Sequence, residues 1–251
     1  MMKFLLYSCL VTGFLFGCQE NNIPEIIDPL PVKDTSNMVL FIGNSYTYYN
    51  DGVDYHLEQL VLADTTVDSV SYVIKSVTKG AYRLEYHWND NVSTSMITSQ
   101  NWDYVVLQEH STRPFVEYEL FELYATKLDS LIREMDSQTA LFMTWPLKDE
   151  PWNITLLDNA YSKVDEKLDA LLAPVGRAWE YVKTTHPEIN LYSSDDKHPS
   201  LSGTYLTSCI FEIVLFGMDP RDSDYVPYGM TFITAAKLRT AAFDYMISLE
   251  A

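Results

Sequence analysis

The sequence predicts an α/β protein in which a parallel sheet lies between two layers of helices, a three-layer α/β/α sandwich. Short apolar runs alternate with longer amphipathic stretches from about residue 38 to residue 216. Three of the runs are continuously apolar, which is typical of parallel strands buried on both faces. The chain has 251 residues, of which 47% are hydrophobic, enough for one sizeable core and one folded domain.

Residues 1–17 are predicted to be a signal peptide. A short basic start, Met1-Met2-Lys3, precedes an apolar run from Phe4 to Phe16 that is too short to span a bilayer as a mature helix. The run ends in Leu15-Phe16-Gly17-Cys18, which resembles the lipobox of bacterial lipoproteins. This resemblance implies acylation of Cys18 and an exported protein of the bacterial cell envelope, on the periplasmic or the cell-surface side. An ordinary secretory signal is the alternative.

Residues 18–36 contain three prolines and no clear periodicity, so we expect an extended tether, followed by a single folded domain at 37–251. Cleavage before Cys18 would remove Cys9. Cys209 would then be the only thiol left, and no disulfide within the chain would be possible.

The element order follows from the hydrophobic pattern. Strands are expected at 38–42, 70–77, 103–107 and 139–144, with a short fifth strand at 189–192. Helical spacing predicts helices at 118–135, 155–172 and 201–216. Catalytic groups in such sheets gather at the carboxyl ends of the strands.

The formal charge of −18, from 35 acidic and 17 basic residues, opposes binding to nucleic acid or to an anionic membrane through charge attraction. A neutral or cationic partner fits better, although a solvated acidic surface requires no partner at all. Membrane contact is expected through the N-terminal lipid only. The oligomeric state does not follow from the sequence.

Gly43-Asn44-Ser45 comes directly after the first predicted strand. A serine at a tight turn after a strand, with glycine before it to permit the backbone path, holds its hydroxyl exposed at the strand end. The same tripeptide occurs in ordinary turns, so its meaning depends on a partner elsewhere in the chain.

Asp195-Asp196-Lys197-His198-Pro199-Ser200 precedes the predicted helix at 201–216. An aspartate three residues before a histidine can reach Nδ1 of that ring, which leaves Nε2 to accept a proton from a serine. The segment therefore fits a general base with its orienting carboxylate. A helix-capping loop with a surface histidine is the alternative.

Together, the serine after the first strand and the DxxHPS segment before the last large helix resemble the SGNH (GDSL-like) hydrolases in type and order. The run DYVVLQEHS is similar to a bacterial subgroup with glutamine, here Gln108, where the family usually has asparagine. Lys79-Gly80-Ala81 resembles the family's glycine block, and the likeness extends from about Met38 to Gly217. It implies a flavodoxin-like sheet and a serine esterase.

The resemblance assigns roles to individual residues. Ser45 would attack a carbonyl, His198 would act as general base and then acid, and Asp195 would orient His198. The backbone N–H groups of Ser45 and Gly80, with the Gln108 side-chain amide, would form an oxyanion hole, each donor typically contributing about 3 kcal/mol. Gln108 is longer than asparagine, and Asn44 replaces the aspartate of the GDS form. The sequence therefore does not determine the geometry of the oxyanion hole.

Two other residues fall near this expected site. His110 is either a substrate contact at the rim or a structural residue. Trp145 either offers a wall for an apolar group or a sugar, or packs within a loop. His56, His87 and His186 lack ligand spacing, so neither a metal nor a cofactor is expected.

The predicted function is hydrolysis of carboxylic esters through an acyl-enzyme, with a small molecule or acetylated carbohydrate as substrate. The carbohydrate follows from the family and the envelope location. A glycan-binding envelope lipoprotein without catalysis and a structural envelope lipoprotein are the alternatives.

Overall fold

The computed structural model describes residues 36–66 and 70–249. They contain a five-stranded parallel sheet with the strand order β2-β1-β3-β4-β5. The strands are β1 (Ser36–Gly43), β2 (Ser71–Thr78), β3 (Tyr104–Leu107), β4 (Gln138–Phe142) and β5 (Leu171–Ala173). The predicted parallel sheet is confirmed. Because the chain moves from β1 to β2 on one side and later to β3 on the other, a crevice is expected at the carboxyl end of β1.

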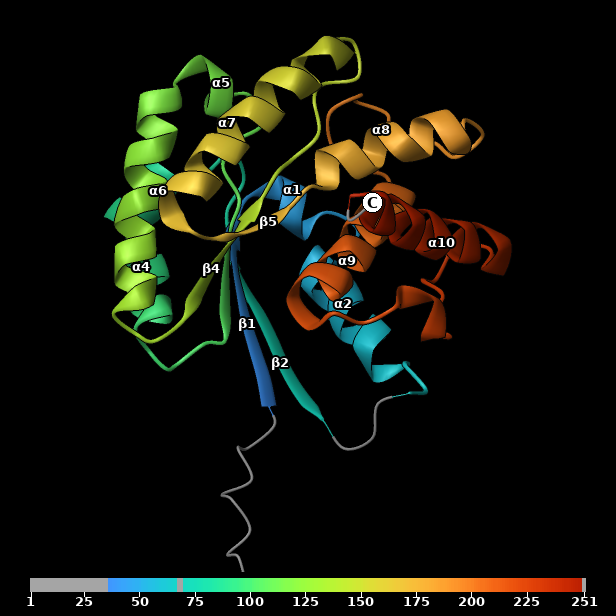
Figure 1. Cartoon of the computed structure of the whole chain (residues 1–251), viewed down its shortest axis with the longest axis horizontal. Coiled ribbons are helices and arrows are strands. Elements are labelled where there is room, and N and C mark those ends of the chain that lie inside the picture. The colour runs from blue at the N-terminus through green and yellow to red at the C-terminus, as the bar shows by residue number, and fades with distance from the viewer. Residues whose placement is uncertain (1–35, 67–69, 250–251) are drawn as a thin grey trace, which may run out of the picture. The chain divides into compact units, whose positions relative to one another are not determined.

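Helices cover both faces of the sheet (Figure 1). One face carries α2 (Val53–Leu62), α8 (Val175–Thr185), α9 (Leu201–Phe216) and α10 (Phe232–Ser248). The other carries α3 (Leu84–Asn89), α4 (Asn91–Ile97), α6 (Tyr118–Arg133) and α7 (Ile154–Leu168). The shorter helices are α1 (Ser45–Tyr48), α5 (Arg113–Val116) and two 3-10 turns at Pro151–Asn153 and Pro220–Asp222. The predicted α/β/α sandwich is therefore confirmed.

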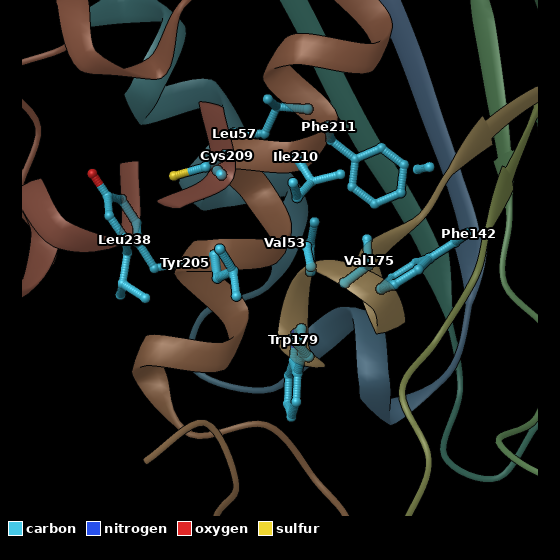
Figure 2. Packing of buried hydrophobic residues seen from close by; sticks show 14 of the residues in the cluster. Val53, Leu57, Phe142, Val175, Trp179, Tyr205, Cys209, Ile210, Phe211 and Leu238 are labelled. Carbon is cyan, nitrogen blue, oxygen red and sulfur yellow. The ribbon is translucent and has the colours of Figure 1, made fainter. Parts of the chain in front are cut away.

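The continuous apolar strands divide their side chains between two cores. In β1, Val39 and Phe41 belong to the core beneath α2, α8, α9 and α10, whereas Leu40 and Ile42 belong to the core on the opposite face. Figure 2 shows the first core, where Phe211 of α9 lies near Phe142. The Phe211 ring meets Phe142 edge to face at 5.0 Å between centroids. Helix α9 thus fixes the orientation of the segment that precedes it.

The prediction of a strand at 189–192 is wrong. Ile189 and Leu191 are buried in the first core, but they belong to a loop. Tyr192 makes only an isolated bridge with Pro199. The fifth strand is Leu171–Ala173, and the sequence placed its first two residues in the predicted helix 155–172. That helix ends at Leu168, where Asp169 takes a left-handed conformation (φ 48°) and ends the helical path.

The predicted signal peptide at 1–17, Cys18 and the tether up to residue 35 lie outside the described residues, and their roles stay predictions. No helix in the described part of the chain combines the length and apolarity needed to cross a bilayer. Cys209 is a buried free thiol on α9.

Candidate active site

A cleft of about 540 Å³ lies at the carboxyl ends of the strands. Its lining consists of Asn44, Ser45, Tyr46, Tyr48, Tyr49, Gly80, Ala81, His110, Ser111, Thr112, Leu147, Lys197 and His198. None of these residues is acidic, although the chain carries a net charge of −18. The side chains that line the cleft therefore carry no negative charge, although the protein as a whole is acidic.

Ser45 lies at the point where β1 gives way to α1. Strand β1 ends at Gly43, and Asn44 caps α1, since its Oδ1 accepts a hydrogen bond from the Tyr46 N–H at 3.1 Å. Ser45 is the first residue of the helix and is 9% exposed. Its hydroxyl is therefore held at the strand end by both the strand and the helix cap, as the sequence predicted.

Gly43 leaves no room for a side chain. A Cβ here would lie 2.5 Å from Thr47 Oγ1 and 2.7 Å from Gln108 Oε1. Its carbonyl accepts hydrogen bonds from His87 Nε2 at 2.9 Å and from the Lys79 N–H at 3.2 Å. Two neighbouring segments thus fix the peptide that leads to Asn44 and Ser45.

His87 is a structural histidine that the sequence did not connect with the site. Its Nε2 must carry the proton because the Gly43 carbonyl can only accept, so Nδ1 accepts from the Ser93 hydroxyl at 2.7 Å. Burial lowers the pKa of His87 to about 4. The ring therefore stays neutral at neutral pH and keeps both hydrogen bonds.

The structure uses Gln108 differently from the oxyanion role that the resemblance implied. Its Oε1 accepts from the Asn44 N–H at 2.8 Å and from the Thr47 hydroxyl at 3.1 Å, and its Nε2 donates to the Glu109 carbonyl at 2.5 Å. Backbone partners fix this assignment, because an N–H only donates and a carbonyl only accepts. Gln108 is 1% exposed and does not line the cleft. The extra methylene turns the amide inward, where it positions Asn44.

Asp195, His198 and Ser45 form a continuous hydrogen-bonded series. Nε2 of His198 lies 2.9 Å from the Ser45 hydroxyl, and Nδ1 lies 2.5 Å from Asp195 Oδ2. The Ser193 hydroxyl, the His198 ring and the backbone N–H groups of His198 and Lys197 all donate to Asp195. These hydrogen bonds hold the pKa of the carboxyl well below its ordinary value. Ionised Asp195 therefore keeps the proton of His198 on Nδ1 and leaves Nε2 to accept.

Trp145 is not part of the substrate rim. It is completely buried, and its ring stacks between Tyr46 at 4.6 Å and Trp179 at 3.8 Å. Its Nε1 donates to the Lys197 carbonyl at 3.0 Å. Trp145 therefore supports the loop that carries His198 instead of facing the substrate.

The tyrosines after Ser45 are the residues that sequence reasoning missed. The Tyr49 ring stacks on His198 with 4.1 Å between centroids and an angle of 5° between the planes. Tyr48 lines the cleft and is 41% exposed. The sequence signal was the aromatic run that follows Ser45, because a short helix at a strand end presents its residues to the same cleft.

Two residues of the cleft lining have backbone N–H groups that the fold leaves unused. Within the described part of the chain, the N–H groups of Ser45 and Gly80 donate no hydrogen bond, and both residues line the cleft. A Cβ at Gly80 would lie 3.2 Å from the Tyr48 hydroxyl. Glycine at this position therefore avoids a close contact with the Tyr48 hydroxyl.

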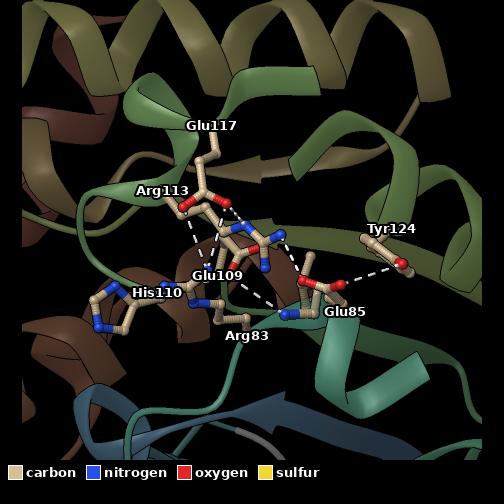
Figure 3. A network of polar contacts seen from close by, with 8 residues as sticks. Arg83, Glu85, Glu109, His110, Arg113, Glu117 and Tyr124 are labelled. Carbon is tan, nitrogen blue, oxygen red and sulfur yellow. Dashed lines mark hydrogen bonds and ion pairs between the residues drawn. The ribbon is translucent and has the colours of Figure 1, made fainter. Parts of the chain in front are cut away.

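His110 lines the cleft, where the sequence placed it. Burial, followed by the charges of Arg83 and Arg113, lowers its pKa, so the ring is neutral at neutral pH. Figure 3 shows its ring turned away from the ion pairs of Arg113 with Glu85 (2.7 Å) and Glu117 (3.2 Å). His110 can thus donate or accept a hydrogen bond in the cleft.

Glu109 fixes the backbone beneath His110. Its Oε1 accepts from the His110 N–H at 2.6 Å and from the Leu84 N–H at 3.3 Å. The residue is fully buried, and burial raises its pKa to about 7 despite the nearby charge of Arg113. Glu109 is not among the residues that line the cleft.

In the described part of the chain, no group of three or more His, Cys, Asp or Glu side chains is arranged to hold a metal ion. His56 and His87 are both buried, and both ring nitrogens of each form hydrogen bonds with protein groups.

No protein-family model matches the sequence, and no curated protein matches it significantly. Among solved structures, a DUF4886 family protein from Bacteroides uniformis is similar with a TM-score of 0.73 and 19% identity, over 86% of this chain and 96% of that one. A candidate SGNH hydrolase from Slackia heliotrinireducens is similar with a TM-score of 0.60 and 21% identity, over 71% of this chain and 98% of that one.

Axe2 from Geobacillus stearothermophilus, an acetyl xylan esterase, is similar with a TM-score of 0.52 and 18% identity, over 71% of this chain and 94% of that one. At these sequence identities, the similarity is evidence for the fold alone. The chain has the three-layer α/β/α fold of the SGNH hydrolases, which confirms the fold that the sequence resemblance implied.

Proposed function

We propose that the protein is a serine esterase that cleaves carboxylic esters through an acyl-enzyme on Ser45. The observation that carries the proposal is the series from Ser45 through His198 to Asp195, with separations of 2.9 Å and 2.5 Å. A serine hydroxyl becomes an effective nucleophile when an adjacent base takes its proton, and a carboxylate on the far side of the imidazole stabilises the cation that forms.

The reaction follows from these positions. The oxygen of Ser45 attacks the ester carbon while its proton passes to Nε2 of His198. The N–H groups of Ser45 and Gly80, two residues of the cleft lining, would stabilise the negative charge on the carbonyl oxygen. The ester C–O bond then breaks, and the alcohol leaves with the proton from His198. A water molecule, deprotonated by His198, releases the acid and restores Ser45.

The lining of the cleft supports a short acyl group on a polar alcohol. Among the described residues, Ala81 and Leu147 are the only aliphatic side chains in the lining, which favours a short acyl group over a fatty chain. The rings of Tyr48 and Tyr49 offer flat surfaces of the kind that pack against sugars. Acetylated carbohydrate is therefore the substrate we propose, and the shared fold of an acetyl xylan esterase is consistent with it.

Turnover of p-nitrophenyl acetate by the purified protein and its variants tests the esterase. Ser45→Ala and His198→Ala are expected to lower kcat by about 10⁴-fold or more, since these residues perform the chemical steps. His110→Ala is the matched control, because its ring lines the cleft but takes no part in the proton transfer.

The wild type is expected to hydrolyse the acetyl ester faster than the octanoyl ester, because the lining of the cleft offers few aliphatic side chains to a longer acyl chain. A folded wild type without turnover on either ester, but with affinity for glycans, would contradict the esterase and leave the glycan-binding alternative.

A further inference from the structure

The segment between α1 and α2 has an unusual backbone. Asn50, Asp51 and Gly52 follow one another at positive φ, with values of 52°, 71° and 99°. For residues other than glycine this region costs on the order of 1 kcal/mol each, although asparagine and aspartate tolerate it better than most. Such a conformation persists only where surrounding contacts fix it.

The backbone of Asn50 is fixed by a buried histidine. Nε2 of His56 lies 2.7 Å from the Asn50 carbonyl, and Nδ1 lies 2.8 Å from the Tyr225 hydroxyl. Since the carbonyl can only accept, Nε2 carries the proton and Nδ1 accepts from Tyr225. His56 is 1% exposed, and the Tyr225 carbonyl itself accepts from Arg239 at 2.8 Å. The peptide of Asn50 is therefore attached to the body of the fold.

The Asn50 side chain connects the segment that follows Ser45 with the segment that follows His198. Its Nδ2 donates to the Pro199 carbonyl at 3.0 Å and to the Thr204 hydroxyl at 2.9 Å. Pro199 directly follows His198, and Thr204 is a fully buried residue in the first turn of α9. One carboxamide thus connects the segment that begins at Ser45 with the segment that carries His198.

This connection bears on catalysis because Ser45 and His198 come from segments 153 residues apart. Their 2.9 Å contact requires the two segments to keep a fixed separation, and a shift of about 1 Å between reacting groups can cost about 100-fold in rate. We infer that Asn50 is a positioning residue, which acts through the Pro199 carbonyl to keep His198 within reach of Ser45. The inference rests on the proposed esterase function.

Asn50→Gly tests the inference with little risk to folding, because glycine accepts the positive φ and only the side chain is lost. We expect kcat on p-nitrophenyl acetate to fall by about 10-fold with KM within about 2-fold, because the substrate-binding surface is unchanged. Asn50→Asp keeps the shape but cannot donate to Pro199, so a similar or larger fall is expected.

Asp51→Gly is the matched control, since it places glycine in the same left-handed run without removing the bridge. A second readout is the low-field resonance of the His198 Nδ1 proton, which reports the contact with Asp195 without any substrate. It is expected to be sharp in the wild type and Asp51→Gly, and broadened in both Asn50 variants.

Asn50 variants with wild-type kcat and an unchanged resonance would overturn the positioning role while leaving the esterase in place. Equal losses in Asp51→Gly would also overturn it, because they would trace to backbone flexibility. A wild type without turnover would instead overturn the esterase and the positioning role together.

Discussion

The two sides of the cleft are built in different ways. Ser45 follows a strand that is buried from Val39 to Gly43, and the groups that fix its turn, His87 and Gln108, are each 1% exposed. His198 lies on an irregular loop, where its side chain is 24% exposed and that of Asp195 is 43% exposed. The groups that fix the serine are therefore buried, whereas the carboxylate that orients the histidine ring is exposed.

Because of this difference, substitutions on the two sides of the cleft should affect stability and catalysis differently. Changes beneath Ser45 disturb buried hydrogen bonds and should alter the free energy of unfolding together with activity. Changes in the His198 loop remove exposed contacts, which contribute little to stability, but they alter the orientation or the tautomer of the base. The variants below test the comparison, beginning with the largest expected effect.

Among the variants that test this comparison, Asp195→Asn should give the largest catalytic loss with the smallest change in stability. An amide beside Nδ1 allows the imidazole to carry its proton on Nε2, where it can no longer accept from Ser45, and kcat should fall by about 10³- to 10⁴-fold. The thermal unfolding midpoint should stay near that of the wild type because the carboxylate is exposed. Steady-state kinetics and a thermal melt measure the two quantities.

Asp196→Asn is the control for this change. Asp196 adjoins Asp195 and has a φ of 58°, which asparagine tolerates, but its carboxylate pairs with Lys148 at 2.6 Å rather than with His198. We expect nearly wild-type kcat. Equal losses in the two variants would show that any disturbance of the loop is sufficient, and the comparison of the two sides would fail.

On the serine side, His87 should make stability depend on pH. Its pKa is lowered from 6.5 to about 4, so between these values the unfolded chain binds a proton that the folded chain does not. The free energy of unfolding should therefore fall as the pH is lowered through this window, by up to about 3 kcal/mol. In His87→Gln, whose Nε2 can still donate to the Gly43 carbonyl, this part of the decline should disappear.

Urea unfolding of both proteins from pH 7 to pH 4 measures the difference. The pKa of Glu109 is raised to about 7, so this group changes the free energy of unfolding with pH in the opposite direction. Its contribution is the same in the wild type and in His87→Gln. His186→Gln, at the end of α8, is the control and should keep the full decline. Parallel curves for wild type and His87→Gln would mean that His87 does not stay neutral beneath Ser45.

The sequence predicted those parts of the molecule that depend on local patterns. Continuous apolar runs marked β1, β3 and β4 because both faces of these strands are buried. Leu171–Ala173 was missed because three apolar residues next to a helix continue the helical pattern. The segment 189–192 was mistaken for a strand because its buried side chains have the composition of one.

The same distinction holds in the site. Ser45, Asp195 and His198 stand in short motifs, and the structure brings them together. The positions of other groups depend on contacts between distant segments, such as Gln108 with Asn44 over 64 residues and Trp145 with Lys197 over 52. No local pattern indicates such contacts, and this is why the inward turn of Gln108 and the burial of Trp145 were not foreseen.

The central claim is that Ser45 is the nucleophile, and mapping the site of covalent modification tests it most directly. The purified protein is treated with a fluorophosphonate, digested and analysed by mass spectrometry. The account predicts a single adduct on Ser45, formed much more slowly in His198→Ala. A folded protein that forms no adduct, or an adduct on another serine, would contradict it.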